Sequence, residues 1–127
     1  MKTFVSRFVA GLLVVVFSMA GLLACSTMSQ YHKTALEARE SVLRDDLMQM
    51  RKLIDQYTFD QGKPPQTLED LTRRGYMREV PDDPMTSKKD WRVIMGEHPS
   101  AKGAKGIIDV RSASTAKSVD GKPYNEW

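Results

Sequence analysis

The spacing of apolar residues predicts one long helix in the first half of the chain. Apolar side chains recur in steps of three, four and seven residues, so they fall on one face at the helical period. The pattern predicts a helix over residues 33–59. It lasts fewer than about four heptads, so we expect this face to cover a small sheet and not to form a coiled coil. The predicted face consists of Leu36, Leu43, Leu47, Met50, Ile54 and Tyr57, widened by Val42 and Leu53.

Charged residues fill the positions between these apolar ones. Glu40, Arg44 and Arg51 fall off the apolar stripe, on the predicted solvent side. Glu40 and Arg44 are four residues apart, in the order that favours an ion pair along a helix. The sequence therefore predicts a helix with one buried side and one charged side.

Helix-breaking residues follow the long helix. Residues 60–65 read D-Q-G-K-P-P, where glycine suits a left-handed exit and the prolines cannot continue a helix. Thr67 is predicted to cap a second, short helix, with Asp70 three residues later and Gly75 at its end. Residues 76–89 hold two prolines and few regular apolar positions, which predicts an extended, turn-rich connector.

The last third of the chain predicts two strands and a packed end. Residues 91–95, W-R-V-I-M, form the first predicted strand, and G-I-I-D-V-R-S, from Gly106, forms the second. Residues 97–105 have little apolar content and are predicted to be a hairpin loop. Two strands alone are marginally stable, so the tail is predicted to add a third strand or a packed loop. Tyr124 and Trp127 would then supply apolar area.

These elements define the predicted fold class. It is α+β, with one long N-terminal helix packed on a small antiparallel sheet and a C-terminal loop.

The N-terminal residues have the layout of a bacterial export signal. Lys2 and Arg7 precede an apolar run over residues 8–24 that ends in small residues. Cys25, the one cysteine of the chain, follows L-L-A. This resembles the bacterial lipobox, in which the cysteine thiol is acylated and becomes the first mature residue. The alternative is an uncleaved membrane helix, since about 18 apolar residues are enough to span a bilayer.

The predicted organisation follows from this layout. Residues 1–24 are an export or lipoprotein signal, residues 25–32 a lipid anchor and tether, and residues 33–127 a folded domain. Both interpretations of the N-terminus place the domain outside the cytoplasm and tethered to a membrane. A single cysteine forms no internal disulfide, so we expect the domain to be held by its core alone.

Composition and charge suit a folded domain without a nucleic-acid partner. Apolar residues make up 41% and charged residues 28% of the chain. The formal net charge is +3, but without Lys2 and Arg7 the 19 basic residues become 17, against 16 acidic ones. Acids and bases are interleaved, and no basic stripe with aromatic residues is visible. We therefore expect no binding to nucleic acid.

No pattern of residues in the sequence predicts an enzyme. His32 and His98 lie near no Ser or Asp pattern of a catalytic triad. Metal-binding H-E-x-x-H, paired C-x-x-C and Gly-rich phosphate motifs do not occur. We interpret the acidic pairs at 45–46 and 82–83 as a solvated helix face and a solvated loop. No catalytic activity and no small-molecule substrate are expected.

The C-terminal tail is the candidate ligand site. Hydroxyls and carboxylates gather around Gly121, and such oxygen-rich loops suit Ca²⁺. The spacing does not match an EF-hand, and Lys117 and Lys122 flank the one carboxylate well inside the loop. The alternative is a turn held by Asp and Ser side chains. The oxygen-bearing residues are Asp109, Ser112, Ser114, Ser118, Asp120 and Glu126.

The order of these motifs resembles the periplasmic domain of the major pseudopilins of type II secretion, relatives of the type IV pilins. The long helix leads into D-Q-G-K-P-P, and L-E-D-L, G-Y-M and V-P-D-D-P follow. The chain then runs through a strand at Trp91 to the ending D-V-R-S…D-G-K-P-Y-N-E-W. The resemblance covers residues 35–127.

The resemblance implies a pilin-like fold and a part in a short filament that pushes folded proteins through the outer membrane. In this family the C-terminal loop commonly binds calcium and the last aromatic residue packs down. By resemblance, Asp120 would be the carboxylate ligand, helped by Ser112, Ser118 and loop carbonyls.

The N-terminus departs from the family pattern. Pseudopilins are cut after a glycine, and a glutamate stands at the fifth position of the new N-terminus. Neither Gly11 nor Gly21 is followed by such a glutamate, and no acidic residue occurs before Glu37. A cut at Cys25 would remove the apolar N-terminal helix that carries filament assembly.

We therefore expect a non-catalytic, lipid-anchored domain that is a structural or accessory part of a type II secretion or type IV filament-like system. Its partners would be the membrane, through the lipid on Cys25, and other secretion or pilus-like proteins. Ser26 stands where an Asp often marks inner-membrane retention, which favours the periplasmic face of the outer membrane. Two alternatives stay open: a true filament subunit with an uncut N-terminal helix, and a small periplasmic calcium- or ligand-binding lipoprotein.

Overall fold

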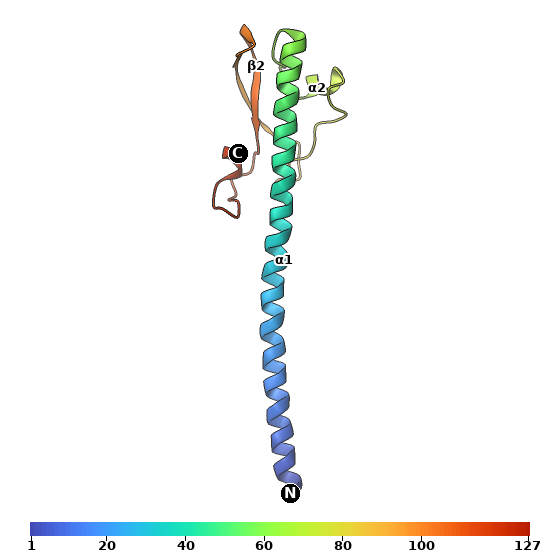
Figure 1. Ribbon diagram of the computed structural model, residues 1–127, viewed down its shortest axis with the longest axis vertical. Helices are drawn as coiled ribbons and strands as arrows, with labels where there is room; N and C mark the ends of the chain where they lie inside the picture. Colours follow the sequence, from blue (N-terminus) through green and yellow to red (C-terminus); the bar gives the residue numbers. More distant parts are fainter. The chain divides into compact units, whose positions relative to one another are not determined.

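The computed structural model describes Met1 and residues 28–127. Helix α1 is Lys2–Gln61 and helix α2 is Glu69–Arg73. Strands β1 (Arg92–His98) and β2 (Ala101–Arg111) follow, and the 3-10 helix η1 (Tyr124–Glu126) lies near the end. The chain divides into two compact units, residues 1–36 and residues 37–127. The second unit is the folded domain, in which β2 lies beside α1 (Figure 1).

The predicted α+β class is confirmed, because the long helix packs on a two-stranded antiparallel sheet. The part of α1 within residues 28–61 contains the whole predicted helix and ends two residues after its predicted end. Gly62 follows with a φ of +68°, the left-handed exit that glycine adopts without steric cost. Except for Met1, the predicted signal and Cys25 lie outside the described residues.

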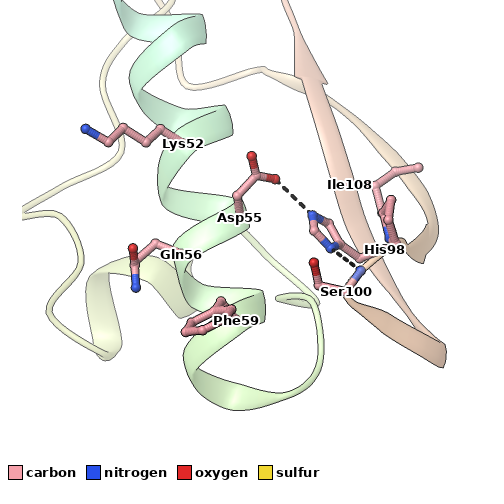
Figure 2. A pocket seen from close by; sticks show the side chains of 8 residues that line it. Lys52, Asp55, Gln56, Phe59, His98, Ser100 and Ile108 are labelled. Atoms are coloured by element: carbon pink, nitrogen blue, oxygen red, sulfur yellow. Dashed lines mark hydrogen bonds and ion pairs between the residues drawn. The ribbon is translucent and has the colours of Figure 1, made fainter.

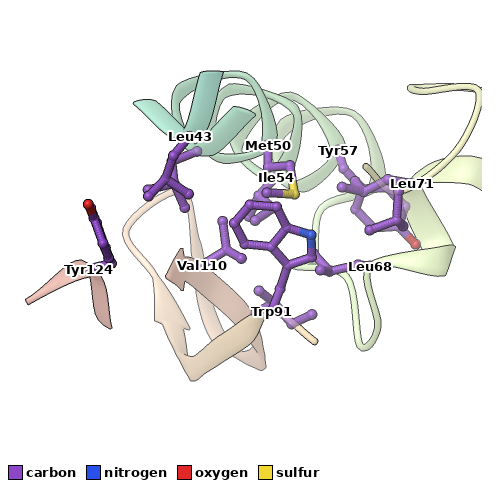
Figure 3. Packing of buried hydrophobic residues seen from close by; sticks show 12 residues of the cluster. Leu43, Met50, Ile54, Tyr57, Leu68, Leu71, Trp91, Val110 and Tyr124 are labelled. Carbon is purple, nitrogen blue, oxygen red and sulfur yellow. The ribbon is translucent and has the colours of Figure 1, made fainter. Parts of the chain in front are cut away.

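The core forms on the predicted face of α1 (Figure 3). Leu43, Met50 and Ile54 are completely buried, and each such side chain stabilises the fold by about 1.5–3 kcal/mol. Val42 is 51% exposed, so its predicted place in the core is wrong. The other members of the core are Leu47, Tyr57, Leu68, Leu71, Val80, Trp91, Ile107, Val110 and Tyr124.

The second helix is shorter than predicted, and the Asp70 side chain holds the segment that leads into it. The Asp70 carboxylate accepts the backbone N–H groups of Gln66, at 2.8 Å, and Thr67, at 3.0 Å. Thr67 makes no side-chain cap, because α2 begins two residues later, at Glu69. Gly75 closes the segment with a φ of +78°, as the sequence predicts.

The two strands form one antiparallel hairpin with a short turn. The sequence predicts a loop over residues 97–105, which is right only for the turn at residues 99–100 and wrong for the rest: β1 continues to His98 and β2 already begins at Ala101. Glu97 pairs with Lys105 across the hairpin. Opposite charges stabilise such exposed cross-strand pairs without burying apolar area, so this part of the ribbon needs no apolar residues.

The prolines that follow α1 cover the outer edge of β2. The Ile107 N–H donates to the Pro65 carbonyl at 2.7 Å, and the Gln66 side chain donates to the Lys105 carbonyl at 2.7 Å. Gly106 fits this contact because a Cβ there would lie only 2.7 Å from the Pro65 oxygen. The sheet therefore has one covered edge, on β2.

The C-terminal tail, residues 112–127, adds a packed loop and no third strand. The sheet contains β1 and β2 alone, and the tail ends in η1. Tyr124 is 1% exposed within the core, and Trp127 packs against the same cluster. The predicted contribution of these two aromatic residues to the core is confirmed.

Candidate functional site

The buried carboxylate of Glu40 anchors the tail to α1. The Tyr124 hydroxyl donates to Glu40 Oε1 at 2.7 Å, and the Val119 N–H donates to the same oxygen at 2.8 Å. Glu40 is only 3% exposed, so its predicted place on the solvent side of the helix is wrong. Both hydrogen bonds are charge-assisted, which makes them the stronger kind.

Burial of this contact shifts the acidity of Tyr124. Burial raises the pKa of the Tyr124 hydroxyl to about 12, and the hydrogen bond to the Glu40 carboxylate adds to the rise. The predicted Glu40–Arg44 pair is formed at 3.9 Å, from a largely exposed Arg44. At that distance the ion pair contributes little, and the tail supplies the main partners of Glu40.

Two arginines of α1 hold the end of the tail. Arg51 donates to the Asp109 carboxylate at 2.6 Å, to the Val110 carbonyl at 2.9 Å and to the main-chain oxygen of Trp127 at 2.8 Å. The Arg44 guanidinium lies 4.5 Å from the centre of the Trp127 ring, within the range of a cation–π contact. The charged side of α1 is therefore a docking surface for β2 and the tail.

Ser118 closes a turn of the tail. The Lys122 N–H donates to Ser118 Oγ at 3.1 Å, and the Ser118 N–H donates to the Lys122 carbonyl at 2.9 Å. Gly121 lies in this turn with a φ of +81°. Asp120, which lies in the same turn just before Gly121, is exposed. Two of the three predicted calcium ligands, Ser118 and Asp120, thus belong to one turn.

Ser112 belongs to a different cluster, around Asp83. The Ser112 hydroxyl donates to Asp83 Oδ2 at 2.6 Å, and the Ala113 N–H donates to the same oxygen at 3.2 Å. The Met85 N–H donates to the other Asp83 oxygen at 2.8 Å. Asp83 is completely buried, so the interpretation of residues 82–83 as a solvated loop holds for Asp82 and is wrong for Asp83.

These contacts determine which oxygen atoms of the tail are available to bind a metal ion. Ser112 and Ser118 are engaged in separate hydrogen-bonded clusters, and the carboxylate beside Ser112 is Asp83 rather than Asp120. Within residues 28–127, no three His, Cys, Asp or Glu side chains are grouped so that they could hold a metal ion. Calcium binding through Asp120 stays a prediction.

Asp46, on α1, is a half-buried carboxylate close to other acids. Burial raises its pKa above the ordinary value, and the nearby Asp45 and Asp83 carboxylates raise it further. Asp45 is exposed, so the interpretation of this pair as a solvated helix face holds only for its first member.

An open groove lies between α1 and the tip of the hairpin. The His98 imidazole contacts the Asp55 carboxylate through Nε2 at 2.9 Å, and its Nδ1 accepts the Ser100 backbone N–H at 3.2 Å (Figure 2). Exposed Phe59 and Lys52 line the same groove. Although His, Asp and Ser are assembled here, both imidazole nitrogens are engaged. Neither is placed to take a proton from a serine hydroxyl.

Sequence reasoning missed the three polar residues that organise the domain: Glu40, Arg51 and Asp83. A signal for Glu40 exists, because position 40 fills the gap of seven residues between Leu36 and Leu43 and completes the four–three spacing of the buried face. Arg51 and Asp83 carry no comparable signal, since their partners are distant in the sequence.

The fold and these contacts define an α+β domain whose tail is fastened to a long helix. Comparisons of the chain with models of protein families, with curated proteins and with solved structures find no significant match. Within residues 28–127, no helix has the length and apolar character needed to cross a membrane.

Proposed function

We propose that this chain is a non-catalytic, membrane-anchored periplasmic component of a type II secretion or type IV filament-like system. The main support for the proposal is that Glu40 and Arg51 of α1, together with Tyr124 and Trp127, attach the tail to the long helix. This arrangement agrees with the pilin-like domain that the sequence motifs imply, in which the last aromatic residue packs down on the domain.

A binding role is supported by how two buried carboxylates, Glu40 and Asp83, and the half-buried Arg51 are used. Glu40, Asp83 and Arg51 all hold segments of the domain together, and each has at least two hydrogen-bond partners. Among the described residues, no buried side-chain polar atom lacks a partner. These groups stabilise the domain and leave its outer surface to interact with other proteins.

Anchoring to the membrane rests on the N-terminal sequence. The apolar run over residues 8–24 and the L-L-A-C sequence support acylation of Cys25. A chain cut at Cys25 keeps a short tether before the folded domain. Ser26 supports delivery to the periplasmic face of the outer membrane, where the domain would act as an accessory or structural part of the machine.

The test is secretion in the bacterium that carries this chain. We expect deletion of its gene to lower the amount of folded exported proteins in the medium while these proteins accumulate in the periplasm. The wild-type gene and the control variant Ser29→Ala restore secretion, whereas Cys25→Ala does not. Unchanged secretion after deletion would contradict the proposal.

One observation favours a true filament subunit as the second candidate. Met28 is 64%, Tyr31 72% and Val42 51% exposed, and with Ala35 and Ala38 they recur in steps of three and four along α1. Apolar residues at this spacing suit helix–helix packing between subunits. Under this candidate Cys25→Ala still restores secretion and Tyr31→Asp does not, which is the reverse of the expectation for the lipoprotein.

A further inference from the structure

Strand β1 has one unpaired edge. It pairs with β2 on one side only, and within the described part of the chain residues 92–98 make no other backbone hydrogen bond. The opposite edge of the sheet, on β2, is covered by Pro65 and Gln66. An open strand edge presents a row of N–H and C=O groups that pair readily with another strand.

This edge lacks the features that usually block such pairing. Natural proteins protect open edges with proline, with very short strands, with charges along the strand or with a bulge in it. β1 is seven residues long and contains no proline, and its centre over residues 93–96 is uncharged. The register shift near Ile94 arises from an extra residue in β2, Ile108, so β1 itself carries no bulge there.

Apolar side chains follow the same edge. Val93 is 39% and Met95 52% exposed, and they lie on one face of β1 because they are two residues apart. Their neighbours across the hairpin, Val110 and Ile107, are completely buried on that face. Val93 also lines a small groove together with Trp91 and other residues of the core. The apolar layer of the sheet thus continues to the unpaired edge.

The sequence of β1 is complementary to itself when two copies run antiparallel. With the two-fold axis at Ile94, the two Ile94 side chains face each other and Val93 lies opposite Met95 of the second copy, twice. Arg92 then faces Gly96, which avoids like charges, and Trp91 faces Glu97. A shift of two residues that centres the pair on Met95 would place Val93 opposite Glu97 and Arg92 opposite His98.

We propose that β1 pairs with β1 of a second copy of this chain, so that two hairpins form one four-stranded antiparallel sheet around a two-fold axis at Ile94. Such an interface is isologous and closes on itself, so it produces a dimer and not a fibre. The proposal does not depend on the proposed function, because it rests on the folded domain and not on the N-terminus.

The first test measures association of the full chain, extracted from membranes in mild detergent. We expect the wild type to be a dimer by size-exclusion chromatography with light scattering. Met95→Lys, which opposes each Val93 with a charge, weakens the dimer about tenfold or more. The control is Met48→Lys on α1, where Met48 is 66% exposed, and it leaves the dimer intact. Far-UV circular dichroism checks that both variants fold.

The second test fixes the register by disulfide trapping in membranes. Residues directly opposite in an antiparallel pair have Cα atoms about 4.5–5.5 Å apart, which a disulfide spans. We expect Ile94→Cys to cross-link on mild oxidation, and a mixture of Val93→Cys and Met95→Cys copies to do the same. Either of these two alone cross-links less, since diagonal positions are about 7–8 Å apart. Met48→Cys is the control for cross-linking at another exposed position, and the wild type is the control for cross-linking through Cys25.

Three results would overturn the proposal. They are a monomeric wild type without an Ile94→Cys cross-link, a dimer that Met95→Lys leaves unchanged, and cross-links equally strong at Met48. The last two would mean that the copies associate through another surface, such as the N-terminal residues.

Discussion

Removal of the Glu40 side chain should release the tail from α1. In the folded domain this carboxylate is 3% exposed and accepts hydrogen bonds from the Tyr124 hydroxyl and the Val119 N–H. Glu40→Ala would leave both donors without their acceptor, and each such charge-assisted bond is worth about 1.5–3 kcal/mol. The variant no longer has to bury a charged carboxylate, and the desolvation energy that is saved offsets part of this loss. We therefore expect the free energy of unfolding to fall by about 2–4 kcal/mol.

Two matched variants separate the hydrogen bonds from other effects. Glu40→Gln keeps an acceptor of similar shape without the charge, so it should cost only about 1 kcal/mol. Ser41→Ala changes the next, exposed position of the same helix and should cost less than about 0.5 kcal/mol. Urea unfolding of the detergent-solubilised chain, followed by circular dichroism and tryptophan fluorescence, gives the three values.

Local measurements distinguish release of the tail from global unfolding. In Glu40→Ala we expect faster hydrogen exchange at the Val119 amide and a red-shifted emission from Trp127, while Trp91 stays buried. If Glu40→Ala were as stable as Ser41→Ala, with unchanged protection of Val119, the assignment of Glu40 as the anchor of the tail would be refuted.

Three further predictions concern the Tyr124 hydroxyl and the carboxylates of Asp46 and Asp120. Because the pKa of Tyr124 is raised to about 12 in the folded state, the free energy of unfolding should fall as the pH rises from 10 to 12. The fall should be about 2–3 kcal/mol larger in the wild type than in Tyr124→Phe, and urea unfolding at alkaline pH measures it. Because burial and neighbouring carboxylates raise the pKa of Asp46, its charged form opposes folding. Asp46→Asn should therefore be the more stable protein at pH 7, with the gain in melting temperature disappearing at acid pH as Asp46 takes up its proton. If Asp120 binds calcium, the melting temperature of the wild type should be higher in CaCl₂ than in EDTA, and Asp120→Asn should abolish this difference. Equal melting temperatures of the wild type in CaCl₂ and in EDTA would contradict calcium binding.

Local sequence patterns predicted the elements but not all of their limits. The spacing of Leu43, Met50 and Ile54 identifies the buried face of α1, since one period describes every turn of a helix. The extended hairpin escaped prediction because its outer part is an exposed ribbon in which pairs such as Glu97–Lys105 replace apolar residues. An apolar pattern finds strands only where one face is buried.

The contacts that fix the tail were less predictable, because they join distant segments. Arg51 meets Asp109 and Trp127 across 58 and 76 residues of sequence, and the Ser112–Asp83 bond spans 29. No local rule pairs such residues. Glu40 is different, because it occupies a position of the apolar stripe of a helix. A charged residue at such a position is a candidate for a buried hydrogen-bond partner of another segment.

We propose that a lipid on Cys25 holds the domain at a membrane. Intact mass of the chain extracted from membranes, beside a Cys25→Ala variant, tests it most directly. We expect a wild-type product that begins at Cys25 and carries added acyl mass, which is absent from the variant. A full-length chain with a bare thiol would contradict the anchor and leave the N-terminal apolar residues available for filament assembly.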